Sequence, residues 1–237
     1  MDLASLRAKD DDIYGRMPAF MRRGEHLLLS NAMFHHKIPL NELNALHHII
    51  DHRSDPLCVK TVCDIYASLV KGTEFEGKSF KKKNVVVTDV DSDHMYVTAS
   101  VEETPYEMEK LCRDFRHLDN PCDDDLDDMI RVCLLAQLIH PFEDGNGRFS
   151  SVLLQFLLQK AHLRCAPLLP FDFMKYGSNM SVITKHIIYA SGAFYGHRPI
   201  VYDKFIPFMK DLICKSYGYL DDTVKRYEMW QGQKKRP

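Results

Sequence analysis

Residues 140–148 read HPFEDGNGR and separate two segments that have helical periodicity. In the segment before them, apolar side chains recur at helical spacing, at Leu126, Met129, Ile130, Cys133 and Leu134. In the segment after them, apolar residues follow the i, i+3, i+4, i+7, i+8 pattern of an amphipathic helix, at Phe149, Val152, Leu153, Phe156 and Leu157. The sequence therefore predicts a helix, a short loop and a second helix, with residues 140–148 forming the loop.

The second half of this loop has the residue types of an anion site. Glycine permits backbone angles that turn successive N–H groups inward, so Gly145, Asn146 and Gly147 are predicted to form a concave nest. A helix begins directly after them, and its free N–H groups and positive dipole end also favour phosphate. Arg148 adds a planar cation whose forked donors match phosphoryl oxygens.

The first half of the loop adds acid–base and metal chemistry. Asp144 precedes the nest, where its carboxylate can hold a Mg²⁺ ion shared with phosphate oxygens. His140 can accept a proton from an attacking hydroxyl near neutral pH. Phe142 supplies an apolar anchor that fixes the loop and aims His140. Each residue taken alone also fits an ordinary turn, but the combination favours a phosphoryl-group transfer site.

The rest of the chain is mainly helical by pattern, with one β-hairpin. Helices are expected at about residues 18–34, 40–53, 56–72, 103–118 and 201–228. Residues 84–98 differ, because NVVVT and HMYVT are β-branched and aromatic and flank the polar turn DVDSD. Lys81, Lys82 and Lys83, directly before this hairpin, are interpreted as a solvated edge.

Composition restricts the class of protein. A chain of 237 residues that is 45% hydrophobic can bury one compact core, and a formal net charge of −2 gives no sign of nucleic-acid binding. The N-terminus is too polar for a secretory signal, and no apolar run reaches membrane-spanning length. The seven scattered cysteines suit reduced thiols. We expect a cytoplasmic protein with no nucleic-acid or membrane partner, and delivery into another cell as an effector is compatible with these features.

The sequence resembles the Fic family, whose signature reads HxFx(D/E)GNGRxxR. Residues 140–148 fit it at every specified place, and only the final arginine is replaced, by Ser151. The resemblance implies a mainly α fold, a helical bundle around a helix–loop–helix active site, with the hairpin at 84–98 as a target-positioning flap. It further implies N-terminal helices at 1–55, with a degenerate inhibitory helix near 26–36, and a catalytic core at 56–230.

The resemblance also implies an activity. Most Fic proteins transfer AMP from ATP to a hydroxyl of a protein side chain. By that likeness His140 is the general base, Asp144 binds Mg²⁺, and Gly145, Asn146, Gly147 and Arg148 hold the phosphates of ATP. The flap strand, at Asn84, Val85, Val86 and Val87, is expected to hold a target segment that presents Ser, Thr or Tyr, by main-chain pairing. The chain itself is also a possible target of modification.

Two positions depart from the family pattern. In the family, the arginine that Ser151 replaces grips the γ-phosphate and pairs with an inhibitory glutamate. The N-terminal segment around Ser30 resembles the inhibitory helix, and there Phe34 stands in the glutamate position. Three interpretations stay open: an AMP transferase freed from inhibition, a Fic-fold transferase with another donor (UMP, phosphocholine or phosphate transfer), or a catalytically degenerate module that binds a nucleotide or partner.

Overall fold

The computed structural model describes much of the chain, namely residues 2–18, 22, 40–77, 79–88, 95–165, 190, 192, 194–195 and 199–234. These residues are mainly helical, as the sequence predicts. In chain order the elements are α1 (Leu3–Arg16), α3 (Leu40–Asp51), α4 (Val59–Leu69), β1 (Val86–Thr88), β2 (Met95–Val97), α5 (Thr104–Asp114), the 3-10 helix η2 (Arg116–Asp119), α6 (Leu126–Ile139), α7 (Asn146–Lys160) and α9 (Phe205–Lys234).

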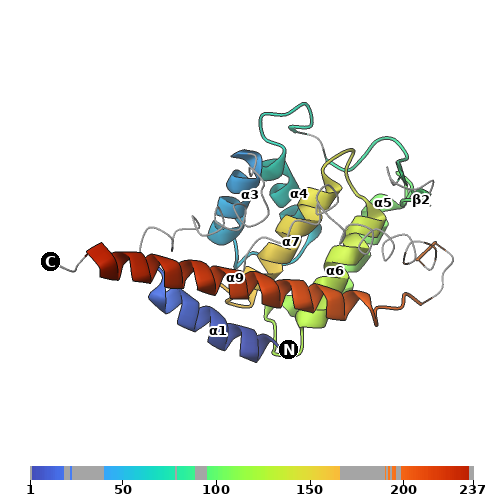
Figure 1. Cartoon of the computed structure of the whole chain (residues 1–237). Coiled ribbons are helices and arrows are strands. Elements are labelled where there is room, and N and C mark those ends of the chain that lie inside the picture. Colours follow the sequence, from blue (N-terminus) through green and yellow to red (C-terminus); the bar gives the residue numbers. More distant parts are fainter. Residues whose placement is uncertain are drawn as a thin grey trace.

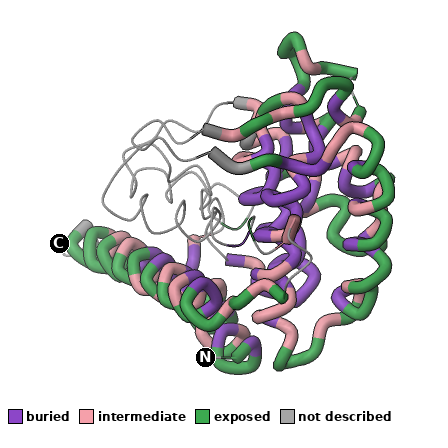
Figure 2. Tube along the Cα trace, turned by 90° about the vertical axis from the view of Figure 1, so that its right-hand side faces the viewer, coloured by how far each residue is buried: buried purple, intermediate pink, exposed green. Residues whose placement is uncertain are grey.

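Helix α7 lies at the centre of the fold. It packs against α6, α3 and α4, and Figure 1 shows it between these helices. Every residue of α7 except Gly147 and Arg148 is buried. The prediction of an amphipathic helix was therefore wrong about its second face, because neighbouring helices cover the polar side as well. Figure 2 shows the buried residues, in purple, gathered in the interior of the molecule.

Helices α3 and α4 match their predictions. The periodicity expected at 40–53 forms α3, and the segment after Pro56 forms α4, which buries Val62, Ile65 and Tyr66. Gly72, which was expected to end this helix, lies three residues beyond it and has φ +78°. The expected helix at 103–118 is split, because α5 ends at Asp114 and η2 continues the chain.

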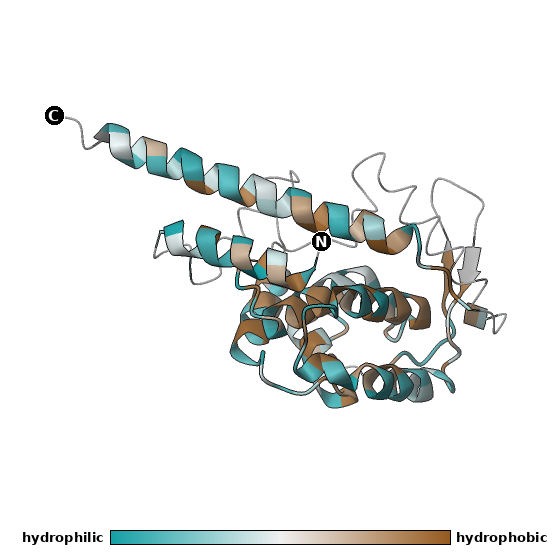
Figure 3. Ribbon diagram, turned by 90° about the horizontal axis from the view of Figure 1, so that it is seen from below, coloured by the Kyte–Doolittle hydropathy of each residue, from teal (hydrophilic) through white to brown (hydrophobic). Residues whose placement is uncertain are grey.

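Two helices at the ends of the chain lie together. Helix α9 runs along one side of the molecule beside α1 (Figure 1), and Arg16 of α1 forms an ion pair with Asp221 of α9. Figure 3 shows hydrophobic residues concentrated in the core helices and hydrophilic ones along the outer part of α9. The sequence pattern did not predict α1. Among the described residues, no helix is long and apolar enough to cross a membrane.

The predicted hairpin is present and short. β1 and β2 pair antiparallel in the register Val86 with Val97, Val87 with Tyr96 and Thr88 with Met95. The turn at 89–94 lies outside the described residues. We call residues 84–98 the flap. The expected helix at 18–34, including Phe34 and most of the segment near 26–36, also lies outside the described residues.

Candidate active site

His140 is placed by the end of α6. It is the C-terminal cap residue of that helix, and its N–H donates to the carbonyl of Ala136 at 3.0 Å. Its backbone is left-handed, with φ 54° and ψ 61°. This conformation costs a non-glycine residue about 1–2 kcal/mol. The chain therefore turns sharply at His140, and a strained backbone sets the direction of the imidazole.

The surroundings of His140 favour the neutral imidazole. Burial lowers the pKa of His140 to about 4, and the positive charge of Lys81 contributes in the same direction. The carbonyl of Gln137 and the charge of Asp144 act in the opposite sense and are outweighed. Nδ1 is buried and has no hydrogen-bond partner in the described part of the chain. At neutral pH the ring is therefore uncharged and able to accept a proton.

Phe142 anchors the loop in the core, as predicted from its apolar side chain. It is completely buried and stacks on Tyr66, with ring centroids 3.6 Å apart and ring planes inclined by 2°. Phe149 also packs against Phe142 in a T-shaped arrangement, with ring centroids 4.9 Å apart. The Tyr66 hydroxyl also donates to the carbonyl of Asp144 at 3.1 Å. One residue of α4 thus holds the loop at two points.

Asn146 ties the two ends of the loop together. Its Oδ1 accepts from the N–H of Phe142 at 3.0 Å, and its Nδ2 donates to the carbonyl of Phe142 at 2.9 Å. The residue is only 2% exposed. Both polar atoms of the Asn146 side chain bond the main chain. Asn146 can therefore contribute to an anion site through its backbone N–H, but not through its side-chain amide.

An uncapped helix N-terminus follows. Gly145 is the N-terminal cap of α7, is left-handed with φ 77°, and provides no side-chain cap. The N–H groups of Asn146, Gly147 and Arg148 consequently have no acceptor within the helix. The Arg148 guanidinium lies over this end and contacts Asp144 at 3.2 Å. This arrangement of amides and a cation is suited to an anion with several oxygens.

The Asp144 carboxylate could contribute to a metal site. Its side chain is 57% exposed and lies beside the uncapped end of α7. Mg²⁺ typically binds one or two carboxylates, water and substrate phosphates, so a single accessible carboxylate fits it. The described residues hold one other group of possible ligands, His117, Asp125 and Asp128. Asp128 lies twelve residues before His140 along α6, about 18 Å by helical rise, so this group is separate from the loop.

Ser151 does not extend the anion site. Its Oγ donates to the carbonyl of Gly147 at 3.1 Å, and the residue is 3% exposed. The hydroxyl is thus directed at the backbone of the preceding turn. It provides no charge for a phosphate.

The flap presents apolar side chains and strand edges. Val86 is 51% exposed and Val97 is 62% exposed. The flap is fixed at its base, where Oδ1 of Asn84 accepts from the N–H of Val101 at 2.9 Å and the carbonyl of Val85 accepts from Thr98 at 2.7 Å. The described sheet has only these two strands, so each strand has an outer edge.

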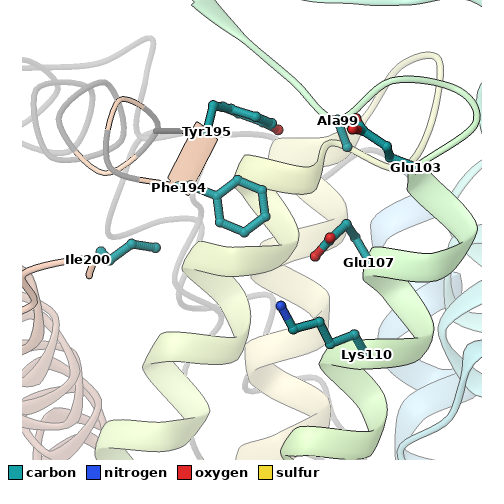
Figure 4. A pocket seen from close by; sticks show the side chains of 7 residues that line it. All are labelled: Ala99, Glu103, Glu107, Lys110, Phe194, Tyr195 and Ile200. Carbon is teal, nitrogen blue, oxygen red and sulfur yellow. The ribbon is translucent and has the colours of Figure 1, made fainter. Parts of the chain in front are cut away.

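A cavity of about 350 Å³ lies between α5 and the segment near residue 195. Figure 4 shows its walls, which are formed by Ala99, Glu103, Glu107, Lys110, Phe194, Tyr195 and Ile200. Tyr195 also donates from its hydroxyl to the carbonyl of Leu138 at 3.0 Å, which places the cavity beside the end of α6. Two carboxylates make the cavity unfavourable for phosphate, whereas its two aromatic rings suit a planar ring system.

Lys81 is the main residue that sequence reasoning missed. The expectation of a solvated edge at Lys81, Lys82 and Lys83 is correct for the last two, which are exposed, and wrong for Lys81, which is 2% exposed. Its Nζ donates to Ile139 and Thr98 near the loop. A run of three lysines carries no signal that distinguishes its members. The roles of the Tyr66 and Tyr195 hydroxyls were equally hidden, because tertiary packing creates them.

Comparisons with known proteins agree with this geometry. Residues 56–158 match the family described as Fic/DOC. Among solved structures, the chain is similar to a Fic domain containing signaling protein from Bacteroides thetaiotaomicron, with 14% identity and a TM-score of 0.58 over 93% of this chain and 85% of that chain. It is also similar to a Fic family protein from Desulfovibrio desulfuricans, with 16% identity and a TM-score of 0.57 over 97% and 74% of the two chains.

A third solved structure, Fic-1 from C. elegans, has 12% identity and a TM-score of 0.52, and the similarity covers 95% of this chain and 70% of that chain. No curated protein sequence matches the chain. Identities this low support the fold alone, whereas the family match includes the loop from His140 to Arg148. Residues 56–158 of this chain therefore match the Fic/DOC family, and the fold is that of Fic domain proteins.

Proposed function

We propose that the protein is an adenylyltransferase that moves AMP from ATP to a hydroxyl side chain of a target protein. Fic domain proteins are generally transferases. The observation that carries the proposal is that a neutral, half-buried histidine and an uncapped helix N-terminus occupy the two ends of one short loop. The first can accept a proton, and the second can hold the phosphates of a donor.

In the proposed reaction His140 acts as general base. Because Nδ1 is buried, we assign proton acceptance to Nε2. The hydroxyl of a target Ser, Thr or Tyr gives its proton to Nε2, and its oxygen attacks the α-phosphorus of ATP. The bond from that phosphorus to the bridging oxygen breaks, so pyrophosphate leaves and AMP stays on the target as a phosphate ester. His140 then releases the proton to solvent.

The donor is proposed to bind at the end of α7. The N–H groups of Asn146, Gly147 and Arg148, with the Arg148 guanidinium, match the negative charge of the phosphates. Asp144 would hold Mg²⁺ there, and a bound Mg²⁺ neutralises phosphate charge during transfer. Phe194 and Tyr195 in the neighbouring cavity offer ring faces for the base of the nucleotide.

The target is proposed to add to the flap. An extended peptide can pair with an outer strand edge through main-chain hydrogen bonds, and the exposed Val86 and Val97 would contact its side chains. Main-chain pairing specifies little about the residues of the target. The proposal therefore names a class of target, a flexible segment with a hydroxyl residue, and it includes a segment of a second copy of this chain.

The proposal is tested by incubating the protein with Mg²⁺ and α-labelled ATP, GTP, CTP or UTP, alone and with cell lysate. Intact mass and transferred label are measured for wild type, His140→Ala and His162→Ala. His162 is a matched control, because it is the other described non-glycine residue with a left-handed backbone, at φ 63°, and it is exposed. We expect an AMP adduct with wild type and His162→Ala, and none with His140→Ala.

Other outcomes change or reject the proposal. Equal labelling by His140→Ala would reject His140 as the base. Histidine-dependent transfer from a nucleotide other than ATP would assign a different donor, consistent with the lack of a charge at Ser151. Binding of Mg·ATP without any adduct, in wild type and in every variant, would favour a nucleotide-binding module.

A further inference from the structure

Lys81 is a buried cation close to the loop that carries His140. Its side chain is 2% exposed, and no carboxylate in the described part of the chain forms a salt bridge with it. Lys160, the other buried lysine of the described core, does pair with a carboxylate, that of Asp119 at 3.3 Å. Burying a charge without a counter-ion is unfavourable, so the burial of Lys81 calls for an explanation beyond packing.

The contacts of Lys81 surround His140. Its backbone N–H donates to the carbonyl of Pro141 at 2.9 Å, and its Nζ donates to the carbonyl of Ile139 at 3.2 Å. One residue therefore holds the carbonyls of both chain neighbours of His140. These bonds restrain the chain on each side of the left-handed residue.

The same ammonium group reaches the flap. Nζ of Lys81 donates to Oγ1 of Thr98 at 2.9 Å, and that hydroxyl donates to the carbonyl of Val85 at 2.7 Å. Thr98 directly follows β2, and Val85 directly precedes β1. The base of the flap and the loop that carries His140 are thus connected through a single buried group.

We propose that Lys81 is a positioning residue that fixes the backbone on both sides of His140 and joins it to the flap, so that the base and the bound target stay in register. The inference rests on the proposed role of His140 as general base and of the flap as the target-binding edge. Lys81 acts through these elements and does not touch the reacting atoms.

The charge of Lys81 adds a second effect. It lowers the pKa of His140, which keeps the imidazole neutral, whereas Asp144 across the loop raises it. Burial lowers the pKa of Lys81 itself to about 8, and Glu103 of α5 opposes this shift. Beside burial, which is the largest cause of the low pKa of His140, the charges of Lys81 and Asp144 thus act on the imidazole, and Glu103 acts on Lys81.

The test uses three variants of the full chain. Lys81→Met removes the charge and the Nζ bonds but keeps an unbranched side chain. Thr98→Val leaves Lys81 and its charge in place and keeps a side chain of similar shape at residue 98. It removes the hydroxyl that connects Lys81 to the carbonyl of Val85. Lys82→Met is the matched control, because Lys82 is an exposed neighbour of the same type. Thermal melting and amide spectra identify any variant that fails to fold.

The first measurement does not require enzymatic activity. The imidazole of His140 is titrated by NMR, with its signal assigned by comparison with His140→Gln. We expect Lys81→Met to raise the His140 titration midpoint by about half a unit or more, because a nearby cation disfavours imidazolium. We expect Thr98→Val and Lys82→Met to leave it unchanged. An unchanged midpoint together with unchanged ring chemical shifts of His140, in a folded Lys81→Met protein, would show that Lys81 affects neither the charge nor the placement of the imidazole. That result would overturn the inference even if the protein transfers no AMP.

The second measurement separates the two contacts during transfer. With a substrate protein identified, Lys81→Met is expected to lower kcat at least tenfold, an order-of-magnitude loss typical of a misplaced base. Thr98→Val is expected mainly to raise KM for the target, because only the flap is loosened. Unchanged kinetics in both folded variants, in a protein that otherwise depends on His140, would reject the positioning role while leaving the proposed function intact.

Discussion

The ring of Tyr66 lies flat against the ring of Phe142, and the hydroxyl of the same tyrosine donates to the carbonyl of Asp144. A single α4 side chain therefore contacts the loop twice, through its ring at Phe142 and through its hydroxyl at Asp144. These two contacts can be separated experimentally, since phenylalanine retains the first and loses the second.

Tyr66→Phe is expected to lower the free energy of unfolding by about 0.5–1.5 kcal/mol, the usual contribution of one hydrogen bond. Tyr66→Ala removes the ring as well and is expected to cost about 3–5 kcal/mol. Denaturant unfolding measures both changes. Tyr106→Phe is the control, because this side chain is 60% exposed. If Tyr66→Phe retains full stability and full transfer, the hydroxyl contact has no role in holding Asp144.

The pH dependence of stability should reveal His140. In the folded state its pKa is about 4, against the ordinary histidine pKa of 6.5, so between these values the unfolded chain binds more protons. The contribution of His140 to the free energy of unfolding therefore rises from about pH 4 to about pH 6.5 and is lost as pH falls through this window. The difference between wild type and His140→Gln, measured by urea unfolding across this range, isolates the effect from the other histidines.

The same pKa predicts the pH dependence of transfer. Since the proposed base is the neutral form of His140, the rate should not depend on its ionisation above about pH 5 and should fall as the pH approaches 4. A pH–rate profile of self-modification measures this. A midpoint near 6.5 would contradict the buried environment described for the imidazole.

A side chain at Gly145 is expected to reduce both stability and nucleotide binding. Its φ of +77° is left-handed, and a Cβ there would lie 3.3 Å from Nη2 of Arg148. Gly145→Ala should lose about 1–2 kcal/mol of stability through backbone strain and should also displace the guanidinium from the proposed phosphate site. Gly77→Ala is the matched control, because Gly77 has φ +75° with no atom within 4 Å of the added Cβ. Both variants should be destabilised alike, and only Gly145→Ala should weaken nucleotide binding.

Arg148 is expected to affect the donor far more than the fold. Its pair with Asp144 is partly exposed, and such pairs contribute about 0–1 kcal/mol to stability. A charged hydrogen bond to phosphate contributes about 1.5–3 kcal/mol, so Arg148→Ala should weaken Mg·ATP binding about ten- to a hundredfold. Titration calorimetry measures this, and Arg113→Ala serves as control, because the Arg113 side chain on α5 is 66% exposed. Equal affinity for wild type and Arg148→Ala would exclude this end of α7 as the phosphate site.

Much of the fold follows from the sequence, because the apolar pattern is strong where helices are buried. The periodicity at 40–53 and after Pro56, the β-branched flap and the loop at 140–148 all predict what forms. Helix α1 was missed because its surface is dominated by charged residues. Its apolar positions Leu3, Leu6 and Ile13 do recur on one face and are buried. The polar Asp10 shares that face and interrupts the pattern.

Asp10 illustrates why a sequence pattern does not predict buried polar residues. It is completely buried, and its carboxylate accepts from the Tyr217 hydroxyl of α9 at 2.8 Å and from the N–H of Cys165 at 2.7 Å. A local sequence window predicts a surface aspartate there. Partners more than 150 residues away convert it into a core residue. Lys81 escaped for the same reason, since its partners lie in the loop and at the base of the flap.

At His140 the left-handed backbone favours glycine for stability, whereas the proposed activity requires histidine. Glycine is the residue best suited to the left-handed turn after a helix, whereas histidine carries a steric cost there. His140→Gly is therefore expected to melt at or above the wild-type temperature while losing transfer entirely. Selection for stability alone would therefore favour loss of the histidine at this residue, and with it the proposed transfer. A stabilised variant of this chain should for that reason be assayed for transfer as well as for stability.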